Sequence, residues 1–280
     1  MRELSSLRRV ARQVRNRILR AAAEERGARP LWDGTPPGAV GDAPEDIPTY
    51  SLYLPQAGKT VRHGVVVFPG GGYLIHAEHE AAPVGRWLRN AGLPAMVARY
   101  RLGPRYRHPT MLIDARHAIR RMREVCADFG VERVGVLGFS AGGHLAGMTA
   151  ILPNEAQSAA ERPDFAILIY PVISMAGPYA HEGCRATLLG QADVTEKAEM
   201  LSLERRVTRE TPPLFLVHGA NDACVHVGNS LSLVLACRQV GVPCELHVFQ
   251  DGAHGFGLGD RGRPNRGWPK LCLEWLRSLP

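Results

Sequence analysis

Short apolar runs rich in β-branched residues alternate with longer segments of helical periodicity from residue 50 to the C-terminus. The apolar runs predict strands at 50–54 (an edge strand), 64–68, 95–99, 133–137, 165–170, 214–218 and 245–249. The segments between them predict helices near 79–91 and at 110–127, 141–151, 227–240 and 268–278. Alternation of this kind predicts an α/β fold, in which a mostly parallel sheet is covered by helices on both faces.

Two segments depart from this alternation. Residues 172–212 are polar and longer than a plain connection, so we expect this segment to form a small helical insertion near the functional site. Residues 1–26 predict a basic amphipathic helix, because apolar residues recur every three or four positions with Arg on the other faces. Three roles are open for this helix: packing on the body or on a second copy of the chain, lying on an anionic membrane surface, or none. The remainder, 27–280, is predicted to be a single domain.

The basic charge of the chain is concentrated at its N-terminal end. Residues 1–29 contain nine Arg and three Glu, which accounts for +6 of the formal net charge of +7. The rest of the chain is nearly neutral, which argues against a nucleic-acid-binding face. The six Cys form no C-x-x-C pair and no His/Cys cluster with zinc spacing, so neither a metal site nor a cofactor is expected.

Signals for membrane insertion or export are not found in the sequence. No run approaches the roughly 20 apolar residues that a membrane-spanning helix needs. The first residues are charged but lack the apolar core of a signal peptide. These features predict a cytoplasmic protein.

A G-x-S-x-G motif joins one predicted strand to the next predicted helix. The sequence GFSAG at 138–142 follows the strand at 133–137 and opens the helix at 141–151. In this setting the serine occupies a tight, strained turn that lifts its hydroxyl above the sheet edge. The helix N-terminus then points free N–H groups at negative charge that develops on a substrate. We therefore predict that Ser140 is a nucleophile; the alternative is a glycine-rich turn with a passive serine.

Three consecutive glycines follow a buried strand, in the sequence PGGGY at 69–73. Glycines in this place serve the backbone, because N–H groups can approach a ligand without a Cβ in the way. A charged tetrahedral intermediate needs such donors, and we predict that the N–H groups of Gly71, Gly72 and Ala141 supply them. The loop lacks the G-K-[ST] ending of a nucleotide-binding loop. Tyr73, next to the glycines, is a candidate for contact with the substrate.

An acid and a histidine follow the last two predicted strands. Asp222 comes after the strand at 214–218, and His254 comes after the strand at 245–249. The carboxyl ends of parallel strands share one sheet edge, where sites form in open α/β sheets. A serine hydroxyl needs an imidazole to take its proton and a carboxylate to orient that imidazole. The order serine, aspartate, histidine along the chain matches that of α/β hydrolases.

Other titratable residues near these motifs are weaker candidates. Asp251 is the main rival as the acid, but it lies three residues before the histidine on the same loop and is poorly placed to reach the far ring nitrogen. His144, in the helix after the nucleophile, is predicted to be a packing residue. His76 and His79 have the H-x-x-H spacing of a metal-ligand pair, but no third ligand is evident.

These motifs, with several others, make the chain resemble the carbohydrate-esterase branch of the α/β hydrolases, in particular acetyl-xylan-esterase-like enzymes related to the hormone-sensitive-lipase group. The resemblance extends from about Leu31 to Leu276. Besides the motifs above, it includes LW at 31–32, PGA at 37–39, HE at 79–80, YRL at 100–102, HP at 108–109, DA at 114–115, YPVI at 170–173, LLG at 188–190, PP at 212–213 and GAHG at 252–255.

The resemblance implies a serine carboxylic-ester hydrolase that removes acetyl or other short acyl groups, from acetylated carbohydrate or another small-molecule or oligosaccharide ester, without a metal. It implies that Ser140, Asp222 and His254 form a catalytic triad beside the oxyanion donors. It also implies that Arg101 and Asp114 form a structural pair that supports the loops. Two alternatives stay open: a lipase or peptidase of the same fold, and a non-catalytic anchoring protein that uses the N-terminal helix.

Overall fold

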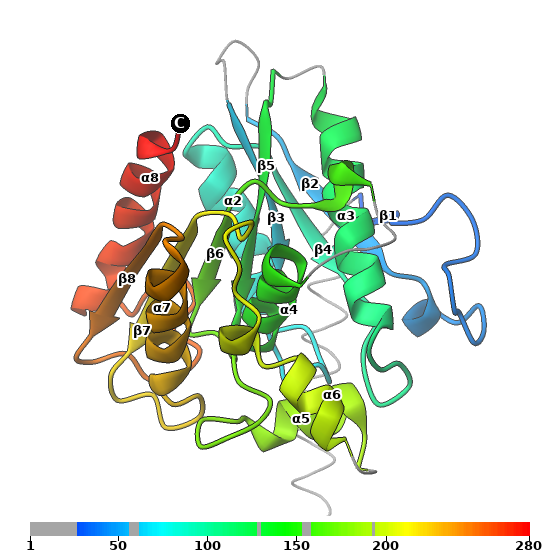
Figure 1. Ribbon diagram of the computed structural model, residues 1–280. Helices are drawn as coiled ribbons and strands as arrows, with labels where there is room; N and C mark the ends of the chain where they lie inside the picture. Colours follow the sequence, from blue (N-terminus) through cyan, green and yellow to red (C-terminus); the bar gives the residue numbers. More distant parts are fainter. Residues whose placement is uncertain (1–26, 56–61, 128–129, 153–157, 192–193) are drawn as a thin grey trace, which may run out of the picture.

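The structure, a computed structural model, describes residues 27–55, 62–127, 130–152, 158–191 and 194–280. Within these residues one eight-stranded sheet forms the centre of the molecule, in the order β1-β2-β4-β3-β5-β6-β7-β8 (Figure 1). The strands are β1 (Arg29–Pro30), β2 (Thr49–Tyr53), β3 (His63–Phe68), β4 (Ala95–Arg99), β5 (Arg133–Phe139), β6 (Ala166–Ile169), β7 (Leu214–Gly219) and β8 (Cys244–Phe249). Neighbours from β4 to β8 are parallel, whereas β1 and β2 pair antiparallel. The predicted mostly parallel sheet is therefore confirmed.

Helices cover both faces of this sheet (Figure 1). One face carries α2 (Ala82–Asn90) and α8 (Trp268–Ser278), and the other carries α3 (Thr110–Cys126), α4 (Ser140–Ile151) and α7 (Gly228–Val240). In β3, Val65 and Val67 belong to the core between the sheet and helices α2 and α8. Val66 belongs to the core between the sheet and helices α3, α4 and α7. Successive side chains of a strand point to opposite faces, so a strand with a core on each side needs a continuous apolar run.

Three boundaries differ from the prediction. The strand at 50–54, expected at the edge of the sheet, is β2, and it lies inside the sheet because the two residues of β1 pair with it. The helix expected near 79–91 is divided into a 3-10 turn, η2 (Glu78–Glu80), and α2, whose first turn contains Pro83. Proline lacks an N–H and is tolerated only in that first turn. β5 runs directly into α4, so Ser140 is the first residue of the helix.

The chain between β6 and β7 contains two short helices, α5 (Glu182–Leu189) and α6 (Thr195–Met200), and the turn η5 (Leu203–Arg205). In Figure 1, α5 and α6 lie at the lower end of the molecule, where the parallel strands finish. These elements fall within 172–212, the segment predicted to hold an insertion. The predicted basic helix at 1–26 lies outside the described residues. None of the helices in the described part of the chain has the length and apolar character needed to cross a bilayer.

A buried ion pair fastens residues 27–49, the connector that leads from the start of the described chain into β2, to the rest of the molecule. The side chains of Arg101 and Asp114 have no exposed surface. Arg101 donates to the carboxylate of Asp114 from Nε at 2.9 Å and from Nη2 at 2.8 Å. Trp32 Nε1 donates to the same carboxylate at 3.1 Å, and Arg101 Nη1 donates to the carbonyl oxygen of Pro37 at 2.9 Å. The predicted structural pair is confirmed, and the segment that it holds is the connector.

We expect Arg101→Leu to lower the free energy of unfolding by about 3–5 kcal/mol, because it leaves a buried carboxylate without its partner. Urea denaturation followed by circular dichroism at neutral pH measures the change. The matched control is Arg121→Leu, because the two acidic partners of Arg121, Asp33 and Glu124, are 81% and 49% exposed, and exposed pairs contribute only about 0–1 kcal/mol. Equal losses in the two variants would contradict the anchoring role of Arg101.

Candidate active site

Ser140 occupies a strained position between β5 and α4. Its φ is +52°, in the left-handed region that residues other than glycine rarely adopt. A Cβ on Gly138 would lie 2.1 Å from the carbonyl oxygen of Gly142, and a Cβ on Gly142 would lie 2.2 Å from the carbonyl oxygen of Phe68. The two glycines of the motif are therefore required for α4 to start this close to the ends of β3 and β5.

Hydrogen bonds join three side chains that follow three different strands. Ser140 Oγ lies 2.9 Å from His254 Nε2, and His254 Nδ1 lies 2.8 Å from Asp222 Oδ2. An ionised carboxylate only accepts, so the Nδ1–H of His254 donates to Asp222, and Nε2 is left to accept from the serine hydroxyl. The structure thus brings together the three residues predicted from the sequence, in the order that a nucleophile, a base and an orienting acid require.

The carboxylate of Asp222 is buried and ionised. Its side chain has no exposed surface. Burial by itself would raise its pKa, but hydrogen bonds from His218, from His254 and from the N–H of Val225 outweigh burial and hold the pKa well below the ordinary range. The N–H groups of Cys224 and Val225 each donate to Oδ1 at 2.9 Å. The carboxylate is therefore fixed in place and available to stabilise a positive charge on the imidazole.

Asp222 and its rival as the acid, Asp251, lie in different surroundings. Asp251 lies at the surface, 52% exposed, with its carboxylate 3.2 Å from Arg263 Nη1. By contrast, Asp222 Oδ2 has a second histidine, His218, with Nε2 at 3.5 Å. The Nδ1 atom of His218 lies 2.7 Å from Ser230 Oγ. Sequence reasoning did not assign His218 a role, although its place in the strand at 214–218, just before the acid, was a signal that could have found it.

The glycine loop lies directly beside the nucleophile. A Cβ on Gly70 would lie 3.0 Å from the Cβ of Ser140. Gly71 and Gly72 have φ values of +120° and +64°, which favour glycine. Ala141 is in the first turn of α4, where N–H groups have no partner within the helix. Among the described residues, the N–H groups of these three predicted donors form no hydrogen bond, so they are free to bind an oxyanion.

The side chain of Tyr73 lies in the core, contrary to the expectation that it contacts the substrate. Its side chain is fully buried, and its hydroxyl lies 2.9 Å from Nδ1 of His144. His144 Nε2 lies 2.9 Å from the carbonyl oxygen of Leu201, so Nε2 carries the hydrogen and Nδ1 accepts from the tyrosine. A buried tyrosine hydroxyl needs such a partner. His144 is thus a buried packing residue, as expected, with a hydrogen bond at each nitrogen.

His76 and His79 lie in different surroundings. Burial lowers the pKa of His76 to about 3, and no side chain or backbone group of the described residues bonds to its Nε2. The Nε2 atom of His79 lies 3.0 Å from the carbonyl oxygen of Gly255. In the part of the chain that the structure describes, no group of three or more His, Cys, Asp or Glu side chains is arranged to hold a metal ion.

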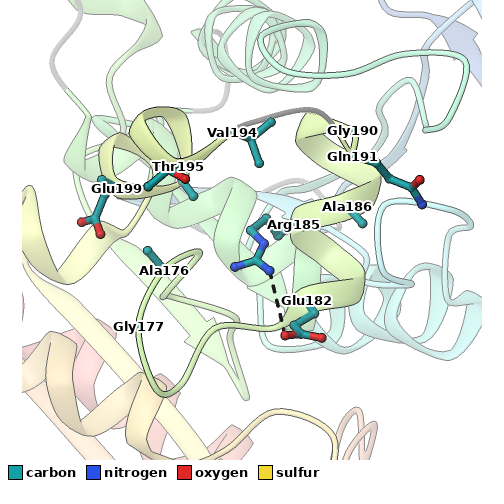
Figure 2. A pocket seen from close by; sticks show the side chains of 11 residues that line it. Ala176, Gly177, Glu182, Arg185, Ala186, Gly190, Gln191, Val194, Thr195 and Glu199 are labelled. Atoms are coloured by element: carbon teal, nitrogen blue, oxygen red, sulfur yellow. Dashed lines mark ion pairs between the residues drawn. The ribbon is translucent and has the colours of Figure 1, made fainter.

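A polar cavity of about 600 Å³ lies within the insertion, between α5 and α6 (Figure 2). Its polar lining consists of Glu182, Arg185, Gln191, Thr195 and Glu199, among small residues. Figure 2 shows Arg185 and Glu182 facing each other. Nη2 of Arg185 lies 3.9 Å from Oε1 of Glu182. Neither Ser140 nor His254 lines this cavity, so it is separate from the hydrogen-bonded site.

Comparison with known proteins identifies similar sequences. The family model BD-FAE matches residues 50–236. Acetylxylan esterase of Xylanibacter ruminicola is 31% identical over 224 residues, which are 77% of this chain and 45% of the relative. Endo-1,4-beta-xylanase B of Butyrivibrio fibrisolvens is 32% identical over 228 residues, 76% of this chain and 35% of the relative. The chain therefore spans less than half the length of these two curated relatives.

Solved structures are similar over nearly the whole chain. The acetyl ester-xyloside bifunctional hydrolase from Caldicellulosiruptor lactoaceticus has a TM-score of 0.82 and 39% identity, covering 90% of this chain and 96% of that chain. The esterase Est2 from Thermogutta terrifontis has a TM-score of 0.71 and 26% identity, covering 90% of this chain and 92% of that chain.

His144 is expected to make stability depend on pH. Burial lowers its pKa to about 4, whereas in the unfolded chain the value is about 6.5. As the pH falls below 6.5 the unfolded chain binds a proton that the native protein does not, so stability falls until about pH 4, by roughly 3 kcal/mol. Urea denaturation between pH 7.5 and 4 should show a shallower decline for His144→Asn than for the wild type. Identical slopes would contradict a neutral, buried His144.

Proposed function

Because the chain belongs to the BD-FAE family, within the carbohydrate-esterase branch of the α/β hydrolases, we propose that it is a serine carboxylic-ester hydrolase. The observation that best supports this activity is the hydrogen-bonded series from Ser140 through His254 to Asp222. Three backbone N–H groups lie free beside it. Nucleophile, base, orienting acid and oxyanion donors are the groups that acyl transfer requires.

The reaction proceeds through an acyl-enzyme. Ser140 Oγ attacks the ester carbonyl carbon while His254 Nε2 takes the hydroxyl proton across 2.9 Å. The carbonyl oxygen becomes an oxyanion, which the N–H groups of Gly71, Gly72 and Ala141 stabilise. The imidazolium then gives its proton to the leaving alcohol, and the acyl group stays on the serine. In the second half, water loses a proton to the imidazole and bonds to the acyl carbon, and the serine oxygen leaves with that proton as the acid is released.

Acetylated carbohydrate is the proposed substrate class. The names of an acetylxylan esterase and of an acetyl ester-xyloside hydrolase among similar proteins support it. Residues 172–212 contain Ala, Gly, His, Glu and Arg more than bulky apolar residues. This composition suits a short acyl group better than the long chain of a lipid, which needs a large apolar entrance.

Residues 1–26 have a separate proposed role. Their Arg-rich periodic sequence supports contact with a second copy of the chain or with an anionic membrane surface. A cytoplasmic location and the lack of a nucleic-acid partner are likewise proposals that rest on the sequence.

We expect Ser140→Ala to reduce kcat for p-nitrophenyl acetate by about 10⁶-fold, because the nucleophile is gone. Asp222→Asn is expected to reduce it by about 10⁴-fold, because an amide does not fix the required tautomer of the imidazole. The matched control is Asp251→Asn, which removes a nearby carboxylate that takes no part in the hydrogen-bonded series. Thermal unfolding verifies that each variant is folded. Wild-type turnover by a folded Ser140→Ala variant would refute the assignment.

The acyl preference is tested with p-nitrophenyl esters from C2 to C12, beside acetylated xylan oligomers. We expect kcat/KM to be highest at C2 to C4 and acetate to be released from the oligomers. A maximum at C8 or longer would favour a lipase and would remove the acetyl proposal.

A further inference from the structure

A buried carboxylate outside the triad contacts the glycine loop. Glu80 ends η2 and is 2% exposed. Its Oε2 accepts a hydrogen bond from the N–H of Gly70 at 2.7 Å, and its Oε1 accepts one from the hydroxyl of Tyr170 at 2.7 Å. Gly70 is the glycine whose Cα faces Ser140 and that precedes the two predicted oxyanion donors of this loop. The carboxylate therefore fixes the loop at the point where it approaches the nucleophile.

Tyr170 continues this connection to the loop that carries the base. It follows β6, is fully buried, and has a φ of +38°. Its hydroxyl accepts a hydrogen bond from the N–H of Gly257 at 2.9 Å, and its ring packs against that of His254 with centroids 5.1 Å apart. Burial and the nearby charge of Glu80 raise the pKa of Tyr170 well above its ordinary value, so the hydroxyl stays protonated and donates a hydrogen bond to the carboxylate.

A second contact joins the same two segments. His79 Nε2 lies 3.0 Å from the carbonyl oxygen of Gly255 and 3.4 Å from Glu80 Oε1. The turn η2 is thus attached to the base loop directly at Gly255 and, through the hydroxyl of Tyr170, at Gly257, one and three residues after His254. Attachment at two points restrains the orientation of the loop as well as its distance.

We propose that Glu80 and Tyr170 are positioning residues, which hold the oxyanion donors and His254 in register through one shared carboxylate. This inference rests on the proposed function, because in acyl transfer the oxyanion must be stabilised at the moment when the imidazole holds the proton. The two groups come from loops far apart in the sequence, and small misplacements of reacting groups are costly in rate. A buried carboxylate is unfavourable unless its oxygens are hydrogen-bonded, and here each oxygen binds a different side of the site.

A neighbouring glutamate provides the matched control. Glu78 lies in the same turn as Glu80 and is 26% exposed. Its carboxylate accepts from the guanidinium of Arg99 at 2.8 and 2.9 Å and forms no hydrogen bond with either site loop in the described residues. Glu78→Gln therefore makes the same chemical change in the same turn without breaking the connection.

Glu80→Gln keeps the side-chain size, but its amide presents N–H to one of the two donors, so one hydrogen bond is lost. We expect kcat for p-nitrophenyl acetate to fall by about 10²-fold, and KM to change by less than about threefold, as for groups that act mainly in the transition state. The affinity for a trifluoromethyl ketone, which forms a tetrahedral adduct with serine, should fall by the same factor as kcat/KM. Glu78→Gln should match the wild type in both measurements. A folded Glu80→Gln variant with wild-type kcat and wild-type affinity would overturn the proposal.

Tyr170→Phe removes only the hydroxyl and keeps the ring against His254, so it decides the question even if Glu80→Gln does not fold. We expect kcat to fall by about tenfold or more, with the double variant no slower than the slower single variant, because both changes break one connection. Wild-type kcat in Tyr170→Phe, or fully additive losses in the double variant, would overturn the proposal. Absence of ester hydrolysis by the wild type would instead refute the proposed function, and the positioning role with it.

Discussion

The hydrogen bond between the Nδ1–H of His254 and the carboxylate of Asp222 is the interaction on which the site depends. It fixes the tautomer that leaves Nε2 facing the serine hydroxyl. It forms only because β7 and β8 are parallel neighbours that end together, with Gly219 opposite Phe249. The carboxylate keeps its charge in a buried position because backbone N–H groups and His218 surround it. The sheet supplies proximity, and the loop after β7 supplies the electrostatic environment.

The nucleophile imposes a second constraint, on the backbone. A left-handed φ at Ser140 costs on the order of 1–3 kcal/mol, and such strain persists only where the surroundings over-determine it. Here the surroundings are the buried strands β3 and β5 and the start of α4, which approach so closely that Gly138 and Gly142 have no room for a Cβ. The core of the sheet therefore maintains a turn that an isolated peptide would not adopt.

Three buried carboxylates each join distant segments of the chain through the hydrogen bonds that they accept. Asp114 joins the connector 27–49 to α3, Asp222 joins the ends of β7 and β8, and Glu80 joins the glycine loop to Tyr170. An unpaired buried charge is strongly unfavourable, so each carboxylate selects the particular donors that satisfy it. Hydrophobic packing is less selective, because many arrangements bury similar areas. These carboxylates therefore specify which distant segments meet.

The sequence alone predicts the fold class, the three residues of the hydrogen-bonded series and, to within a few residues, every strand except β1 and the helices α2, α3, α4, α7 and α8. These follow from local periodicity and from motifs whose position after a strand is visible in the chain. The tertiary structure was needed to place two tyrosines: Tyr73, beside the glycines, is turned into the core, whereas Tyr170 packs on His254. It also decided that β1 covers β2 and that Glu80 reaches both sides of the site. These features depend on contacts between residues as much as 90 positions apart, as between Glu80 and Tyr170. Periodicity carries no information over such separations, because it reports only which face of its own element a residue occupies.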